Sequence, residues 1–202
     1  MSLRAQVRDA VMKHVTVNNP NHSHNPRHKR VLEVDRATDT RSVVAYEQSL
    51  RDRDREVGAF FDQQGNFLSE LKASADPLQL DASFSQVPPG SVFTHNHPYL
   101  ADRAELTDDQ TFSDSDFMQA AKMKLGELRV VTNRGVHIAT PGPKGWGDRQ
   151  AIWADYGRFF GPALAEAKAT GVGFFRGRRA ILERMLAEKY GWRISFIPFE
   201  DQ

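Results

Sequence analysis

The chain has 202 residues, no cysteine, and 27 basic against 26 acidic residues, for a formal net charge of +1. The absence of cysteine excludes disulfides and a thiolate nucleophile, and it restricts any metal site to His, Asp or Glu. The balanced charge argues against a protein whose main partner is nucleic acid. No apolar run approaches the ~20 residues of a membrane span, and the start lacks the apolar centre of a secretory signal. We therefore expect a globular, cytoplasmic protein with no membrane partner.

The N-terminal region predicts one helix followed by a polar arm. Apolar residues recur at helical spacing over residues 4–15. Residues 18–30 are rich in Asn, Pro and His, which is typical of a loop, and include His22, His24 and His28. No carboxylate stands at a natural ligand spacing from these histidines and no strand positions them. We interpret the segment as an exposed arm rather than a metal site.

The next part of the chain favours short strands. The apolar stretches at 31–35 and 42–46 are each compatible with a strand, and the alternating charges at 51–55 indicate a solvated segment. Residues 56–62 strongly predict a strand, and residues 67–71 predict its partner after a Gln-Gln-Gly-Asn turn. The two form a predicted hairpin.

A short apolar run, Val92-Phe93, leads into Thr-His-Asn-His-Pro. Residues i and i+2 of an extended segment point the same way, so His95 and His97 are expected to converge on one point. Pro98 ends the segment. This stretch is the centre of the functional interpretation.

From Ser113 the pattern becomes helical, with apolar residues on one face as far as Leu125. Ser113 is well placed as the N-cap, Asp116 favours the first turn, and we expect Gly126 to close the helix. The remaining expected elements are a hairpin over 128–140, a helix over 148–169 with a break near Gly161-Pro162, a loop over 171–177, a helix over 178–190 and a strand over 192–197.

His95, His97 and Asp116 would provide two imidazoles and one carboxylate, which leaves a fourth position for water as in a catalytic zinc site. Hydrolysis also needs a base for that water and a donor for the developing oxyanion. Ser113, one helical turn before Asp116, is a candidate donor. Glu56, at the start of a predicted strand, is the first candidate for the base.

Two other carboxylates are weaker candidates for the base, Glu47 ahead of Glu70. Gly58, just after Glu56, would allow a neighbouring chain to approach closely. His137, in the second hairpin, is interpreted as filling the core or its rim, with a supporting role at the metal as the minority alternative.

Glu56, His95-Asn-His97-Pro98 and Ser113-x-x-Asp116 together resemble the signature of the JAMM (JAB/MPN) metalloprotease family, and the His-Asn-His-Pro wording is closest to its bacterial and prophage RadC-like branch. The resemblance spans roughly residues 55–140. It implies that His95, His97 and Asp116 bind Zn2+, that Glu56 is the general acid/base, and that Ser113 supports the tetrahedral intermediate. Fifteen residues separate His97 from Ser113, more than is usual in the family.

The long 98–112 segment carries Asp102, Glu105, Asp108 and Asp109 and is either a lid or substrate-selecting insertion, or a sign that Ser-x-x-Asp is an ordinary helix cap. The resemblance implies an α/β fold with a curved mixed sheet flanked by helices, layered as in cytidine deaminases. We expect three regions: an N-terminal helix and arm (1–30), the metal-binding domain (31–147) and a helical C-terminal extension packed on it (148–202).

The function that the resemblance implies is a zinc-dependent metallopeptidase or isopeptidase. Its substrate would be a protein or peptide, such as a ubiquitin-like conjugate, a precursor protein or a peptide crosslink. The alternative is a non-catalytic JAB-like scaffold in a phage or bacterial assembly, and a homo-oligomer stays open. A metal-dependent nuclease is a weaker third reading, because three adjacent letters, His-Asn-His, do not make that dispersed motif.

Overall fold

A computed structural model describes residues 42–72, 80, 87–98, 111–171 and 174–199. The chain divides into two units, Met1–Val31 and Leu32–Gln202, and every described residue belongs to the second. The expected helix at 4–15, the histidine-containing arm at 18–30, the strand at 31–35 and most of the 98–112 segment lie outside the described residues. None of the helices in the described part has the length and apolar character that crossing a membrane requires.

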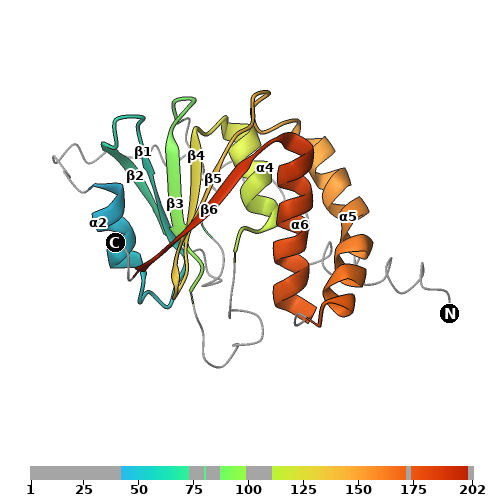
Figure 1. Cartoon of the computed structure of the whole chain (residues 1–202). Coiled ribbons are helices and arrows are strands. Elements are labelled where there is room, and N and C mark those ends of the chain that lie inside the picture. Colours follow the sequence, from blue (N-terminus) through green and yellow to red (C-terminus); the bar gives the residue numbers. More distant parts are fainter. Residues whose placement is uncertain (1–41, 73–79, 81–86, 99–110, 172–173, 200–202) are drawn as a thin grey trace, which may run out of the picture. The chain divides into compact units, whose positions relative to one another are not determined.

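A six-stranded mixed sheet forms the centre of the second unit (Figure 1). Its strand order is β2-β1-β3-β4-β5-β6, with β3 and β4 parallel and every other neighbouring pair antiparallel. Both predicted hairpins are confirmed, as is the α/β class. The strands are β1 (Val57–Phe61), β2 (Phe67–Lys72), β3 (Val92–Asn96), β4 (Glu127–Val131), β5 (Gly135–Thr140) and β6 (Arg193–Pro198).

Helices cover both faces of this sheet (Figure 1). Alternate residues of β1 show the division: Phe60 packs with α4, α5 and α6, whereas Ala59 and Phe61 pack with α2. Because β6 pairs with β5, the C-terminal region contributes a strand to the sheet as well as two helices. The helices are α2 (Val43–Leu50), α4 (Asp114–Met123), α5 (Arg149–Ala169) and α6 (Phe174–Tyr190).

The expected strand at 42–46 is wrong, because these residues begin helix α2. The Ser42 side chain accepts a hydrogen bond from the Ala45 N–H at 3.2 Å and so caps the helix. Tyr46 and Leu50, one turn apart, are buried against the α2 face of the sheet. The cap at Ser42 and the burial of Tyr46 and Leu50 together outweigh the preference of Val43 and Val44 for a strand.

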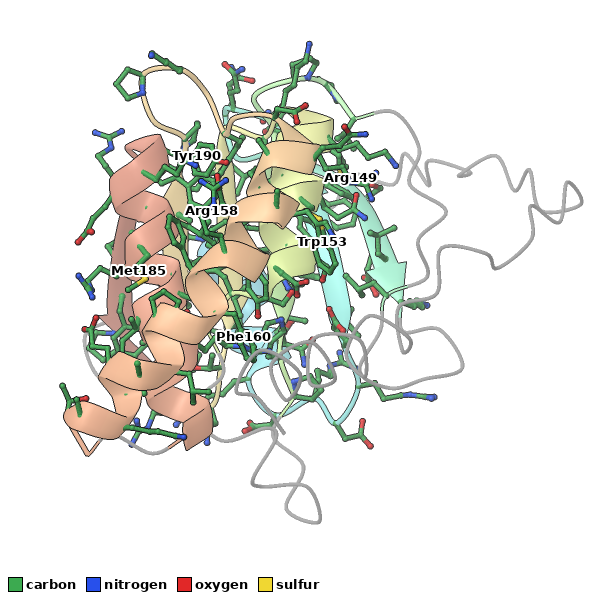
Figure 2. The ribbon with its side chains drawn as sticks, turned by 90° about the vertical axis from the view of Figure 1, so that its right-hand side faces the viewer. Arg149, Trp153, Arg158, Phe160, Met185 and Tyr190 are labelled. Carbon is green, nitrogen blue, oxygen red and sulfur yellow. The ribbon has the colours of Figure 1, made fainter. Side chains whose placement is uncertain are left out.

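The expected break at Gly161-Pro162 is also wrong, since α5 continues through Pro162. A proline inside a helix removes one hydrogen bond and costs about 3 kcal/mol. Phe160 and Ala163 on either side of it are buried with Leu182 of α6, and this packing offsets the cost. Figure 2 looks onto the two helices, with Phe160 on α5 and Met185 on α6.

Two helix ends differ from expectation. Helix α4 ends at Lys124, which adopts the left-handed conformation (φ 53°), two residues before the expected Gly126. Helix α6 begins at Phe174, inside the expected loop. Gly191 ends α6 with a φ of 71°, a left-handed conformation that favours glycine.

A buried ion pair ties α2 to the sheet. The Glu47 carboxylate, which is fully buried, accepts hydrogen bonds from Arg129 Nε at 2.6 Å and Nη2 at 3.0 Å. It also accepts one from the Thr94 hydroxyl at 2.9 Å. Burial lowers the pKa of Arg129, but the Glu47 carboxylate outweighs it, so the net effect is a raised pKa. Removing either partner would leave a buried charge without compensation.

We therefore expect Glu47→Ala to lower the free energy of unfolding by about 3–5 kcal/mol. The matched control is Glu127→Ala, which removes the more exposed carboxylate on the same arginine and should cost under about 1 kcal/mol. Urea denaturation of both variants measures the difference. Equal losses would show that Glu47 is not the anchoring partner.

Candidate metal centre

Strand β3 delivers the two histidines to one face of the sheet. His95 is fully buried, and its Nε2 atom lies 3.2 Å from Nε2 of His97. The His97 N–H donates to the Val131 carbonyl at 2.9 Å, so the end of β3 is held by the neighbouring strand. The expected convergence of the two side chains is confirmed.

Gly58 makes room for His95 on the adjacent strand. The two residues are opposite each other in the β1–β3 register. A Cβ atom at position 58 would lie 2.9 Å from the His95 Cβ and 3.0 Å from the Phe93 ring. The His95 ring stacks on the Phe93 ring, with centroids 5.0 Å apart and planes inclined by 14°. A side chain at position 58 would therefore displace the histidine.

The start of α4 brings a carboxylate to the pair. Ser113 and Asp116 form a capping box: the Asp116 N–H donates to Ser113 Oγ at 3.2 Å, and the Ser113 N–H donates to Asp116 Oδ2 at 2.7 Å. This fixes the Asp116 side chain with Oδ1 3.2 Å from His95 Nε2 and Oδ2 3.5 Å from His97 Nε2. The three expected ligands lie together although the chain between them is long.

These distances fit a tetrahedral ion. At zinc–ligand distances of 2.0–2.1 Å, donors at the corners of a tetrahedron lie about 3.3 Å apart. The Nε2 atoms of His95 and His97 lie 3.2 Å apart, and the Asp116 carboxylate places Oδ1 3.2 Å from His95 Nε2 and Oδ2 3.5 Å from His97 Nε2, so it offers an oxygen at this spacing to each histidine. Neutral imidazoles and a carboxylate are also donors that zinc accepts. The donor set therefore suits zinc in both chemistry and spacing.

Glu56 lies beside the same centre, just before β1. Its Oε1 atom is 3.9 Å from His95 Nε2, and Glu56, His95 and His97 also form a group whose ligand atoms could hold a metal. The contact is longer than those of Asp116, as expected for a group next to the coordination sphere. Glu56 is largely buried, with 9% of its surface exposed.

Asn96, the middle residue of His-Asn-His, holds Glu56 in place. Its side-chain oxygen accepts a hydrogen bond from the Val57 N–H at 2.7 Å, and its amide donates to the Arg55 carbonyl at 3.0 Å. These bonds clamp the backbone on both sides of Glu56. Sequence reasoning missed this role, because the sequence does not show which distant backbone groups the Asn96 side chain will bind.

Electrostatics in the centre favour an ionised Asp116. Burial raises the pKa of Asp116, but His95 and His97 outweigh it and hold that pKa well below its usual value. Burial lowers the pKa of His95, yet Asp116 and Glu56 reverse the effect and leave it raised. For His97, burial dominates and the pKa is lowered. Because a metal binds the neutral imidazole, its binding would compete with protonation of His95.

The other candidate bases lie away from the centre. Glu47 is bound by Arg129 and Thr94 on the α2 side of the sheet. Glu70 pairs with Ala59 in the β1–β2 register. Cross-strand partners share a face, and Ala59 belongs to the α2 side, so Glu70 lies on that side too.

The candidate oxyanion donor, the Ser113 hydroxyl, caps α4 and lies 2.8 Å from Ser115 Oγ.

A second polar cluster, which sequence reasoning did not assemble, lies against the same face. The Thr111 hydroxyl donates a short hydrogen bond to Glu183 of α6 and lies 3.4 Å from His137 Nδ1. Burial, with His97 nearby, lowers the pKa of His137 to about 4. Burial raises the pKa of Glu183 to about 7, although Thr111 and Arg179 oppose the shift. Helix α6 thus brings an acid to the edge of the metal centre.

No family model, curated protein or solved structure matches this chain. The chemistry of the candidate centre is therefore inferred from its side chains and their geometry alone.

Gly58→Ala tests the close approach of β1 to His95. We expect a loss of about 1–3 kcal/mol in unfolding free energy from overpacking and at least a tenfold loss of zinc affinity, read by calorimetric titration. Gly157→Ala is the matched control, because a Cβ there meets no atom within 4 Å. Unchanged zinc affinity in Gly58→Ala would contradict the geometry described.

The raised pKa of Glu183 predicts how the stability of the protein changes with pH. Between pH 4.5 and 7 the folded state keeps a proton that the unfolded state has released, so this group's contribution falls as pH rises through that window. Glu183→Gln cannot lose this proton, so its free energy of unfolding should not fall in this window. Relative to wild type, the variant should therefore be more stable at pH 8 than at pH 4.5 by roughly 2 kcal/mol. Urea unfolding at both pH values, with Glu188→Gln as control, measures it; a parallel pH dependence of wild type and Glu183→Gln would refute it.

Proposed function

We propose that the protein is a zinc-dependent hydrolase of amide bonds, a metallopeptidase or isopeptidase of the JAMM type. The observation that carries the proposal is the spacing of the three donor groups of His95, His97 and Asp116, with Glu56 beside them. A mixed sheet with helices on both faces is compatible with the fold which that family implies.

His95, His97 and Asp116 would hold the ion. A bound zinc ion supplies the Lewis acidity that makes a water molecule nucleophilic near neutral pH. The capping box orients Asp116 from behind, as partners outside the ligand shell do at metal sites. Phe93 stacks on the His95 ring and limits its rotation.

Glu56 is the proposed general acid/base. It takes a proton from the attacking water at its carboxylate and returns that proton to the leaving amine. Its distance from His95 and its clamped backbone support this role over that of a fourth ligand. Ser113 is the proposed donor to the oxyanion of the attacked carbonyl, a role supported by its position one turn from Asp116.

The proposed substrate is a protein or peptide. The 98–112 segment lies between the second histidine and the helix cap, and α6 borders the centre through Glu183, so these two parts of the chain are the natural source of specificity. The ubiquitin-like conjugate, the precursor protein and the peptide crosslink all remain within this substrate class.

Metal titration separates the roles of the four residues. We expect wild type to bind one zinc ion per chain by mass spectrometry and calorimetry. His95→Ala and Asp116→Asn should lose at least 100-fold in affinity, because each removes a ligand. Glu56→Gln should keep its affinity within about threefold and lose peptide hydrolysis by at least 10²-fold. Glu70→Gln, on the other side of the sheet, is the matched control.

The proposal fails if His95→Ala binds zinc as tightly as wild type. Loss of zinc in Glu56→Gln would instead make Glu56 a ligand and remove it as the base. A metal-free wild-type protein that forms a defined oligomer would favour the scaffold alternative.

A further inference from the structure

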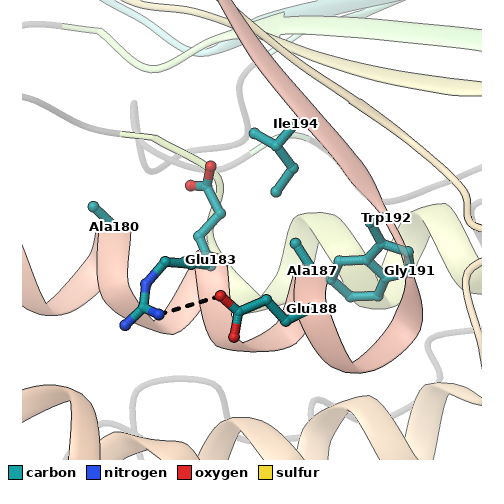
Figure 3. Close-up of a pocket in the computed structure, with 8 residues that line it drawn as sticks. Ala180, Glu183, Ala187, Glu188, Gly191, Trp192 and Ile194 are labelled. Carbon is teal, nitrogen blue, oxygen red and sulfur yellow. Dashed lines mark hydrogen bonds and ion pairs between the residues drawn. The ribbon is translucent and has the colours of Figure 1, made fainter.

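A groove lies along α6 and the start of β6 (Figure 3). It has a volume of about 530 Å³, within the range of sites that bind small ligands. Ala187, Trp192 and Ile194 provide apolar lining, and the carboxyl group of Glu183 lines it as well. The groove thus combines an apolar wall with three charged residues, Glu183, Arg184 and Glu188.

Among the residues that the structure describes, one of the two carboxylate oxygens of Glu183 accepts a hydrogen bond. Its Oε2 atom accepts the hydrogen bond from Thr111, which leaves Oε1 for another donor. Within the described residues it has no ion-pair partner. Arg179, one turn earlier on α6, influences the pKa of Glu183 but does not pair with it in the described part of the chain. A cationic donor in the groove would complete its pairing.

The other charges lining the groove are already compensated. Arg184 donates to both oxygens of Glu166 at 2.8 Å and to Glu188 at 3.2 Å, the latter drawn in Figure 3. The Arg184 guanidinium is therefore held away from Glu183 by two carboxylates. Glu183 is left as the acidic group of the groove that can take a ligand's charge.

We propose that this groove is a subsite for a lysine side chain of the substrate, with Glu183 receiving its ammonium group. A single available carboxylate oxygen suits a compact ammonium better than a guanidinium, which prefers to bind both oxygens. The methylene stem of lysine would lie along Ala187, Trp192 and Ile194. The lysine is a recognition residue near the scissile amide and not the amide nitrogen itself.

The Glu183 end of the groove is the end near the metal centre. Thr111, which contacts Glu183, precedes Ser113 by two residues, and Ser113 caps the helix that carries Asp116. His137, which contacts Thr111, is close enough to His97 for the charge of His97 to help lower the pKa of His137. The inference rests on the proposed peptide hydrolysis, because that is what makes a neighbouring subsite useful.

Binding to the full-length Glu56→Gln variant tests the subsite separately from cleavage. The probes are two acetylated, amidated pentapeptides, Gly-Gly-Lys-Gly-Gly and the same sequence with norleucine, which keeps the stem but lacks the ammonium. At pH 8, where Glu183 with its pKa of about 7 is ionised, we expect calorimetry to show at least tenfold tighter binding of the lysine peptide. Adding Glu183→Gln should reduce that preference to under threefold, whereas adding Glu70→Gln, on the α2 side of the sheet, should leave it unchanged.

Equal binding of the two peptides, no binding of the lysine peptide, or an unchanged preference in Glu183→Gln would overturn the proposal. Ala187→Leu is a second variant that fills the groove without altering charge, and it should weaken both peptides. Because these readouts involve no hydrolysis, they hold whether or not the wild type cleaves peptides. Failure of cleavage with the lysine preference intact would refute the proposed function and leave a lysine-binding groove.

Discussion

The carboxylate of Asp116 is the interaction on which the candidate centre depends. One oxygen accepts the N–H of Ser113 and lies near His97, and the other lies near His95. A single side chain therefore closes the first turn of α4 and joins that turn to the end of β3. Because a capped helix start has few conformations, the carboxylate is held next to the two histidines.

The sheet provides the second constraint. Gly58 opposite His95 lets β1 approach, and Asn96 fastens the chain on both sides of Glu56. The two faces of β3 contact different helices. His95 faces α4 with Phe93, whereas Thr94 faces α2 and hydrogen-bonds to Glu47. The Glu47–Arg129 ion pair thus stabilises the strand from the face opposite the candidate centre.

The sequence predicted the elements that carry a clear local signal. The hairpins, the strand before His95 and the cap at Ser113 follow from alternation, turn residues and capping chemistry. The histidine pair and Asp116 could be proposed together because their signature is ordered along the chain. Helix α2 and the unbroken α5 could not be predicted, because distant packing reverses the local preferences of Val43, Val44 and Pro162.

The rest of the site depends on contacts that span much of the chain. Glu183 and Thr111 are 72 residues apart in the sequence, so no sequence motif joins them. They come into contact only because α6 packs on the sheet. Asn96 acts through backbone groups, which no side-chain motif reveals. The sequence already ranked Glu56 ahead of Glu47 and Glu70, but placing those two carboxylates on the opposite face from the histidines needed the sheet.

Diffraction from crystals of the zinc-soaked protein, recorded on both sides of the zinc absorption edge, would show whether and where the ion binds. The account predicts one anomalous peak, about 2.0–2.1 Å from Nε2 of His95, Nε2 of His97 and a carboxylate oxygen of Asp116. Glu56 should lie outside that shell. A peak at His22, His24 and His28, or no peak between β3 and α4, would contradict it.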